Sequence, residues 1–363
     1  MKKSKKLLSL LLAVLLIAAL MLMSVLAAET ETAPADGLLT YAVYVKNAAG
    51  IPAAGAKVVL TEQVRLLDGT VGVGKSYVFQ ASALGLILIP KHLTGVYTIT
   101  AEWTSPLFGI RHISAPGLHW SASIAPDLDL ITVFPVPDLK LNYTDHTRYL
   151  QGYPDGTVRP NGCLTRAEAA AMLYRVVDPS EFRKDVSSRL TDIKGHWAEK
   201  EITALASKGI IRGVTATTFD PDAPILRRDL FTMIGRLFVR EFTTDGIIGN
   251  FFVDLGNSYY TQSIDLLYNL GLVRGDANAK TVRPNDKITR AETATLLNRL
   301  LLRQPDSQSA DACSNVVTWP DCKKTDWFYA DVMEASNTHN YTIELKVLTL
   351  GNHFAEVWTE THN

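Results

Sequence analysis

The chain has 363 residues, of which 47% are apolar and 20% are charged, and its formal net charge at pH 7 is −1. This composition is typical of a folded protein with two or three domains and excludes a disordered chain. The near-zero net charge argues against a polycation that coats nucleic acid or an anionic membrane. An acidic ligand would therefore have to be bound by a few well-placed arginines.

The first 28 residues are predicted to form an export signal. Lysines precede an apolar run from Leu7 to Leu26, and small residues follow it. Cleavage is expected after Ala27 or Ala28, although a run of about 20 apolar residues is also long enough to remain as an uncleaved membrane anchor. We therefore expect a secreted protein of the cell surface that has no membrane contact after cleavage.

Residues 38–134 are predicted to form an all-β sandwich. Short alternating runs such as TYAVYVK, AKVVLTEQ and GVYTITAEW are separated by turn sequences, which is the pattern of strands in a sandwich. The runs IPAAGAKVVL, GLILIP and GVYTIT resemble prealbumin-like modules of the carboxypeptidase regulatory-like and collagen-adhesin B-type kinds. A segment containing prolines, 135–142, is predicted to be a linker to the rest of the chain.

No catalytic motif is visible, so we expect a protein that is not an enzyme. The sequence contains no H-E-x-x-H, G-x-S-x-G or phosphate-binding loop. Its histidines are scattered, and the nearest approach to a cluster is His112 and His119 beside Trp120. Such a pair of histidines is expected to be solvated rather than catalytic.

Cysteine spacing gives no indication of a metal site. The three cysteines, Cys163, Cys313 and Cys322, contain no C-x-x-C pair. In an exported protein Cys313 and Cys322 could form a disulfide, but spacing alone does not decide whether they do. The prediction is therefore that the protein binds neither metal nor cofactor.

The rest of the chain is dominated by an internal repeat. LTRAEAAAMLYR starts at Leu164, ILRRDLFTMIGR at Ile225 and ITRAETATLLNR at Ile288. Each copy is predicted to consist of a helix, a loop such as GYPDGTVRP and a second helix. The first copy lacks its first helix, but DWFYADVMEA near the C-terminus aligns with that helix in the other copies. We therefore expect the C-terminal segment to complete the first repeat, so that the three repeats close on one another.

The start of the second helix contains two kinds of signal. Thr165 with Glu168, and Thr289 with Glu292, are spaced as capping boxes and explain the start of the helix without a ligand. The arginine at the first helical position opposes the helix dipole and needs a different explanation. It could bind an anion together with nearby free N–H groups, or it could contact an aspartate or the carbonyl groups of a neighbouring repeat. These arginines are Arg166, Arg227 and Arg290.

The repeats resemble S-layer homology domains, on the combined evidence of TRAE, GYPDGTVRP and HWAEKEI in order and in register. The resemblance implies an all-α bundle with pseudo-threefold symmetry that binds a secondary cell wall polysaccharide, often pyruvylated and linked to peptidoglycan. Arginine would suit such a carboxylate because its guanidinium group makes bidentate contacts. The predicted boundaries are 143–178 for the first repeat, with its first helix supplied by 319–340, then 190–240, 252–303 and a closing segment 319–358.

The resemblance also implies further binding residues. Trp197, Tyr259 and Trp327 would contact the apolar face of a sugar, or else pack in the core. Asp192, Asp254 and Asp321 would accept hydrogen bonds from sugar hydroxyl groups, or else cap the first helix.

The middle copy departs from the pattern of the other two. Leu226 replaces the capping threonine and Asp229 replaces the glutamate, so the site of Arg227 is expected to be weakened. The sequence thus favours a wall-anchored display or adhesion protein, with a wall-anchored enzyme or a structural S-layer subunit as alternatives.

Overall fold

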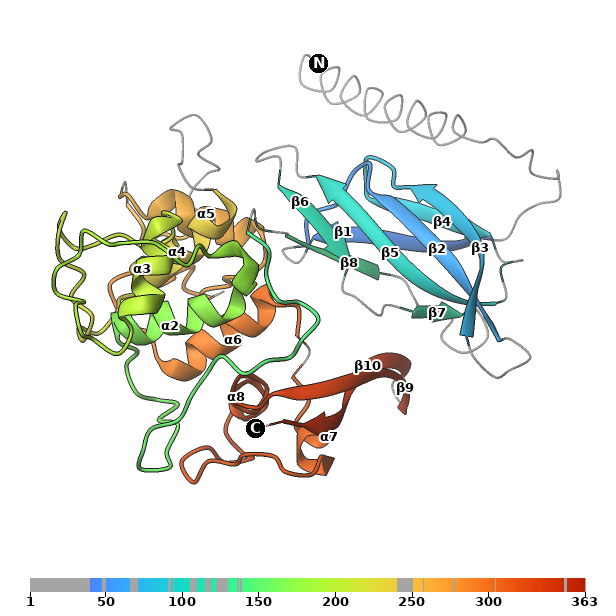
Figure 1. Ribbon diagram of the computed structural model, residues 1–363. Coiled ribbons are helices and arrows are strands. Elements are labelled where there is room, and N and C mark those ends of the chain that lie inside the picture. The colour runs from blue at the N-terminus through green and yellow to red at the C-terminus, as the bar shows by residue number, and fades with distance from the viewer. Residues whose placement is uncertain are drawn as a thin grey trace, which may run out of the picture. The chain divides into compact units, whose positions relative to one another are not determined.

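The protein was analysed as a computed structural model (Figure 1). The residues that the structure describes are 40–47, 50–65, 71–90, 93, 95–104, 110–114, 119–121, 130–135, 137, 139–239, 251–256, 258–276, 278–303, 305–348 and 351–362. The predicted export signal lies outside these residues. Two compact units are present, one mainly from Ile51–Thr104 and Ile113–Val133 with the segment up to Asn47, the other mainly from Phe134–Asn363.

The first unit is a single curled sheet rather than the predicted two-layered sandwich. Its strands run in the order β3-β2-β5-β6-β8-β1-β4, and β7 pairs with β5. The strands are β1 Thr40–Asn47, β2 Lys57–Arg65, β3 Val71–Gln80, β4 Leu86–Pro90, β5 Val96–Thr104, β6 Arg111–Ser114, β7 His119–Ser121 and β8 Leu130–Pro135.

Alternation along the strands explains both the success and the failure of that prediction. Val43 and Val45 of β1, Val58 and Leu60 of β2 and Ile99 of β5 are all buried in one core. Alternating residues specify that one face of each strand is buried. They do not specify whether that face packs on a second sheet or is enclosed by the curling of its own sheet.

The second unit contains the predicted helices, but the expectation of an all-α bundle is wrong. Its last two elements, β9 and β10, form an antiparallel hairpin that pairs Tyr341 with Trp358. The unit's elements are α2 Arg166–Val176, the 3-10 helix η1 Pro179–Glu181, α3 Glu199–Ser207, α4 Arg227–Phe238, α5 Thr261–Asn269, α6 Arg290–Leu300, α7 Ser307–Ala312, α8 Tyr329–Ser336, β9 His339–Leu348 and β10 Gly351–Thr361. The alignment of repeats ended in the α8 region and gave no account of the alternating apolar residues after it.

The three similar helix starts meet at one point inside this unit. The N–H of Leu164 donates to the carbonyl of Ile288 at 3.0 Å, that of Ile225 donates to Leu164 at 2.8 Å, and that of Ile288 donates to Ile225 at 3.3 Å. All three side chains are buried. Each repeat therefore starts its second helix from a shared cycle of hydrogen bonds, and the same local sequence is needed three times.

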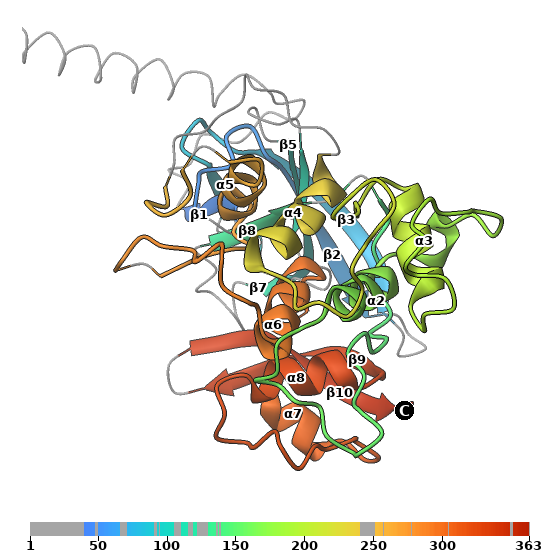
Figure 2. The ribbon, with the colours of Figure 1, turned by 90° about the vertical axis from the view of Figure 1, so that its left-hand side faces the viewer.

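The C-terminal segment contacts the first repeat. The N–H groups of Tyr149 and Leu150 both donate to the carbonyl of Ala335 at 2.9 Å. Within the helical region α2 packs against α3, α4 against α5, and α6 against α8 (Figure 2). Helix α8 thus packs against α6 and, through the carbonyl of Ala335, also contacts the first repeat.

Candidate functional site

The three repeated arginines are buried and cross to a neighbouring repeat. Their exposed fractions are 6% for Arg166, 9% for Arg227 and 4% for Arg290. In each case Nε–H donates to a backbone carbonyl of the next loop. The acceptors are Phe219 at 2.7 Å, Val282 at 2.9 Å and Val158 at 2.8 Å, respectively. This is one of the two arrangements that the sequence left open, in which the arginine holds a neighbouring repeat.

Two of these arginines also form an ion pair with a capping-box glutamate. Nη1 of Arg227 lies 2.9 Å from Oε1 of Glu292, and Nη1 of Arg290 lies 2.8 Å from Oε1 of Glu168. The same carboxylates start helices α6 and α2, because the threonine and glutamate of each capping box form both expected hydrogen bonds. Each glutamate therefore stabilises its own helix and binds the arginine of another.

The irregular middle repeat changes the surroundings of Arg166 rather than those of Arg227, and the weakened binding expected at Arg227 stays a prediction. Asp229 replaces the glutamate that would face Arg166, and its carboxylate instead accepts a 2.6 Å hydrogen bond from the hydroxyl of Tyr259. Among the residues that the structure describes, Arg166 has carbonyl partners, Phe219 and Arg212, but no ion pair. Burial lowers the pKa of Arg166, and Asp229 partly opposes that shift.

The expectation of free N–H groups at these helix starts is also wrong. The N–H groups of Arg166 and Ala167 donate to the carbonyls of Ala223 and Pro221 in the neighbouring loop, at 2.9 and 2.8 Å. The third N–H of the turn donates to the hydroxyl of Thr165. Helices α4 and α6 use their first two N–H groups in the same way. An anion would therefore have to displace hydrogen bonds between repeats.

The three aspartates bind the same loops as the arginines. The arginines donate to a carbonyl of each loop, and the aspartates accept from its N–H groups. Asp192 accepts from the N–H groups of Phe219 and Asp220, at 2.9 and 2.7 Å. Asp254 does the same for Val282 and Arg283, and Asp321 for Val158 and Arg159. The aspartates are thus neither caps of the first helix nor free acceptors.

Each of these loops contains a residue in the left-handed region, where a side chain is unfavourable. The φ angles are 48° at Arg159, 60° at Asp220 and 53° at Arg283. The aspartate that accepts from each of these residues favours the conformation. At Asp192 burial raises the carboxyl pKa, but the hydrogen bonds from Asp220 and Phe219 outweigh burial and lower it overall.

The three aromatic residues are the exposed members of the predicted site. The exposed fractions are 59% for Trp197, 65% for Tyr259 and 67% for Trp327, so none of them packs in the core. They occupy equivalent positions just before helices α3, α5 and α8. Tyr259 is connected to the framework by its hydrogen bond to Asp229. The predicted site therefore consists of a buried polar framework with accessible rings, and its binding role stays a prediction.

The structure brings together a second polar group that the sequence did not indicate. His146, Glu334, His339 and Glu356 are all buried, and one potential ligand atom from each lies within 4.8 Å of the others. Their separation along the chain, and their position outside the repeat pattern, concealed them. The only available signal was the presence of two histidines, His146 and His339, at the two ends of the repeat region.

Other sequence predictions concerned histidines and cysteines. His112 is buried rather than solvated, and burial lowers its pKa to about 4. The three cysteines are free thiols, and no disulfide joins Cys313 to Cys322. In the part of the chain that the structure describes, no helix has the length and apolar character needed to cross a membrane.

Comparison with known families identifies the repeats. Residues 149–170, 189–231 and 251–294 match the S-layer homology domain. These segments contain the three arginines at the helix starts and two of the three loop-holding aspartates, Asp192 and Asp254. The chain therefore contains S-layer homology repeats, and it is a protein of the cell surface that is anchored to the wall. The resemblance of its first unit to prealbumin-like modules stays a prediction.

Its relatives include a cell surface glycoprotein and S-layer proteins of bacteria. It is 30% identical to Cell surface glycoprotein 1 of Acetivibrio thermocellus over 210 residues, which is 55% of this chain and 9% of the relative. It is 29% identical to the Cellulosome-anchoring protein of the same organism over 207 residues, 55% of this chain and 44% of the relative. S-layer protein EA1 of Bacillus anthracis is 26% identical over 158 residues, 43% of this chain and 18% of the relative. The chain thus matches less than half the length of each of these relatives.

Proposed function

We propose that the repeats bind a secondary cell wall polysaccharide through the exposed aromatic residues, and that the first unit is displayed for adhesion or interaction. The observation that carries the proposal is the repeated presence of large exposed rings, Trp197, Tyr259 and Trp327, at equivalent positions. A single exposed ring needs no explanation, but the same exposure repeated at three equivalent positions supports a shared role in contact with a ligand. Aromatic residues are also among the most effective contact residues at binding surfaces.

The buried arginines would support these rings rather than act as the main contacts. Arg227 and Arg290 already pair with glutamates, so their charges are largely satisfied. Arg166 pairs with no carboxylate of the described residues, and a carboxylate on the sugar, such as a pyruvate ketal, would suit its guanidinium group. The preferred position for an acidic sugar is therefore beside Arg166 and Tyr259, at the repeat whose Asp229 is too short to pair with that arginine.

We further propose that the protein is not an enzyme. Its function requires only that the repeats bind the wall and that the first unit remain folded and accessible. The curled sheet of that unit, with a single apolar core, is consistent with a compact display module.

Sedimentation of the full chain with purified cell walls tests the proposal. The chain should sediment with native walls and remain in solution with walls from which the secondary polymer has been removed by acid. Purified polymer added in excess should release the bound chain. Equal binding to both wall preparations would assign the ligand to peptidoglycan itself and overturn the proposal.

A further inference from the structure

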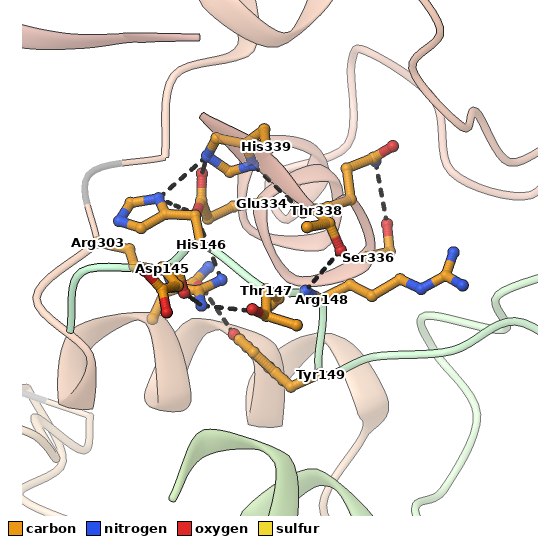
Figure 3. Close-up of polar contacts among 12 residues, drawn as sticks. Asp145, His146, Thr147, Arg148, Tyr149, Arg303, Glu334, Ser336, Thr338 and His339 are labelled. Atoms are coloured by element: carbon orange, nitrogen blue, oxygen red, sulfur yellow. Dashed lines mark hydrogen bonds and ion pairs between the residues drawn. The ribbon is translucent and has the colours of Figure 1, made fainter. Parts of the chain in front are cut away.

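His146, Glu334 and His339 point toward one another (Figure 3), and Glu356 completes a buried cluster with them. His146 lies just before the first matched segment at 149–170, Glu334 in helix α8, His339 at the start of β9 and Glu356 in β10. The two histidines are also joined by an isolated antiparallel bridge of their backbones. The cluster therefore connects the beginning of the second unit to its C-terminal hairpin.

The polar atoms of this cluster converge on one small volume. Nδ1 of His146 lies 3.0 Å from Nε2 of His339, 3.0 Å from Oε1 of Glu334 and 3.1 Å from Oε1 of Glu356. Nε2 of His339 lies 3.4 Å from Glu334 and 3.6 Å from Glu356. All four side chains are at most 5% exposed, so bulk water does not separate their charges.

Protonation of the four side chains cannot give every buried donor and acceptor of the cluster a hydrogen-bond partner. A single proton on Nδ1 of His146 can serve only one of its three acceptors, which leaves the other lone pairs facing one another. If both imidazoles are protonated, two N–H groups point at each other across 3.0 Å. Glu334 lies close to His146 and Arg303, but neither of its carboxylate oxygens has a well-aligned hydrogen bond among the described residues, although buried acceptors are normally paired.

The surroundings of His339 favour a lone pair directed into the cluster. Its Nδ1 lies 3.2 Å from the carbonyl oxygen of Asn337, a contact that is favourable when Nδ1 carries the proton. In the neutral ring, Nε2 then presents its lone pair to the two glutamates. The indole of Trp358 stacks on the same ring at 3.7 Å between centroids and fixes its plane. Metal-binding histidines are usually oriented by such a hydrogen bond from the second nitrogen.

The net charge of the cluster and its surroundings also favours a bound cation. Arg303 is the nearest fixed positive charge, with Nη1 3.5 Å from Oε1 of Glu334. Its Nη2 is directed away and donates to the carbonyl oxygens of Asp145 and Thr147. With neutral imidazoles, two buried carboxylates and one guanidinium group carry a net charge of about −1, which is costly in a buried site.

We propose that these four side chains bind one divalent transition-metal ion, with zinc the best fit. Two imidazole nitrogens and two carboxylate oxygens are ordinary zinc ligands, whereas calcium and magnesium select oxygen ligands. Four ligands at about 2.0–2.1 Å from a tetrahedral zinc ion lie about 3.3 Å apart. The distances between the histidine nitrogens and the neighbouring ligand atoms, from 3.0 to 3.6 Å, agree with this spacing between ligands.

The bound ion is structural. It joins His146, which precedes the first matched segment at 149–170, to three ligands that follow the last matched segment at 251–294, and therefore closes the helical region between its two ends. Closing a long segment of chain by a metal stabilises the folded state through the entropy of the unfolded chain and through the binding energy itself. With four protein ligands, no position is left for substrate.

Metal binding to the full chain can be measured directly. After dialysis against a chelator and then micromolar zinc, we expect about one zinc ion per chain and a melting temperature about 5 °C or more above that of the chelated protein. Cobalt(II) should give the intense visible absorption of a four-coordinate site, a signal that requires no variant to fold. Calcium and magnesium should have no effect on the melting temperature.

Variants identify the ligands. His339→Gln and Glu356→Gln should lower zinc affinity by about 100-fold or more and abolish the cobalt spectrum. The matched control is His362→Gln, which removes an exposed histidine paired with Glu360 on the same hairpin and should retain both signals. The proposal is overturned if the wild-type chain binds no zinc or cobalt, if its melting temperature is the same with chelator and with zinc, or if calcium is the ion bound.

Discussion

At the scale of single residues, the repeated arginine acts as a connection between repeats. Its Nε–H holds the carbonyl of a neighbouring loop, and an aspartate holds the next N–H groups of that loop from the opposite side. Arg290 and Asp321 show this for the loop at Val158, which contains the left-handed Arg159. The result is a rigid loop, held by charged groups whose positions in the sequence suggested ligand binding.

Substitution of the arginines should therefore affect stability, and to different degrees. Arg290→Ala removes an ion pair with Glu168 and leaves that carboxylate half-buried, so a loss of about 3–5 kcal/mol is expected. Arg166→Ala removes hydrogen bonds to carbonyls only, and should cost about 1.5–3 kcal/mol. Urea unfolding of both variants measures the difference. Unchanged stability together with lost wall affinity would instead make the arginines direct ligands.

In the middle repeat Asp229 has a shorter side chain than the glutamates of the other two repeats, and lengthening it should stabilise the protein. Asp229→Glu should let the carboxylate reach Arg166 and raise the free energy of unfolding by about 1 kcal/mol. The matched control is Glu292→Asp, which should shorten the partner of Arg227 and destabilise the protein by a similar amount. Urea unfolding measures both changes. If neither substitution shifts the unfolding midpoint, pairing between these arginines and carboxylates does not stabilise the protein.

At the scale of elements, helix α5 contains an acidic residue without a compensating contact. Asp265 is 4% exposed, and its carboxylate oxygens have no hydrogen-bond partner among the described residues. Burial raises its pKa to about 6. Since the pKa in the unfolded chain is about 3.9, the folded state holds this proton more tightly. Its contribution to stability is fully present below about pH 4 and is lost as the pH rises through about 6.

Asp265→Asn should therefore stabilise the protein at pH 7 by up to about 3 kcal/mol and have little effect at pH 4. Thermal melts between these two pH values measure the change. Asp331→Asn in α8 is the control, because that carboxylate accepts hydrogen bonds from Thr295 and Asn298 and its loss should be destabilising. A stabilisation at pH 4 equal to that at pH 7 would show that ionisation of Asp265 is not the cause.

At the scale of the whole molecule, local signals in the sequence predicted more than long-range contacts. The capping boxes at Thr165 and Thr289 formed as expected, because they depend on residues three positions apart. The carbonyl groups that accept from the Nε–H of these arginines lie 53 to 132 residues away along the chain, and no local pattern specifies them. The curled sheet was missed for the same reason, since its strand partners depend on the tertiary fold. The β9-β10 hairpin pairs adjacent strands and was missed because the alignment of repeats ended before it.

In the candidate site, too, the features that depend on the tertiary fold could not be predicted from the sequence. Exposure of Trp197, Tyr259 and Trp327 could not be derived from the repeat, because an aromatic residue at a helix start can equally pack inward. The buried cluster around His146 was not predictable at all, since its ligands come from both ends of the repeat region. Sequence similarity identified the repeats, while the structure separated the residues that build them from those that remain accessible.

Wall binding by the full chain with all three aromatic residues replaced by alanine tests the central claim most directly. These side chains are more than half exposed, so the melting temperature should change little. The fraction that sediments with native walls should fall to the level that the wild-type chain shows with walls stripped of their secondary polymer. If the triple variant melts like the wild type and still sediments fully with native walls, the exposed rings do not anchor this protein.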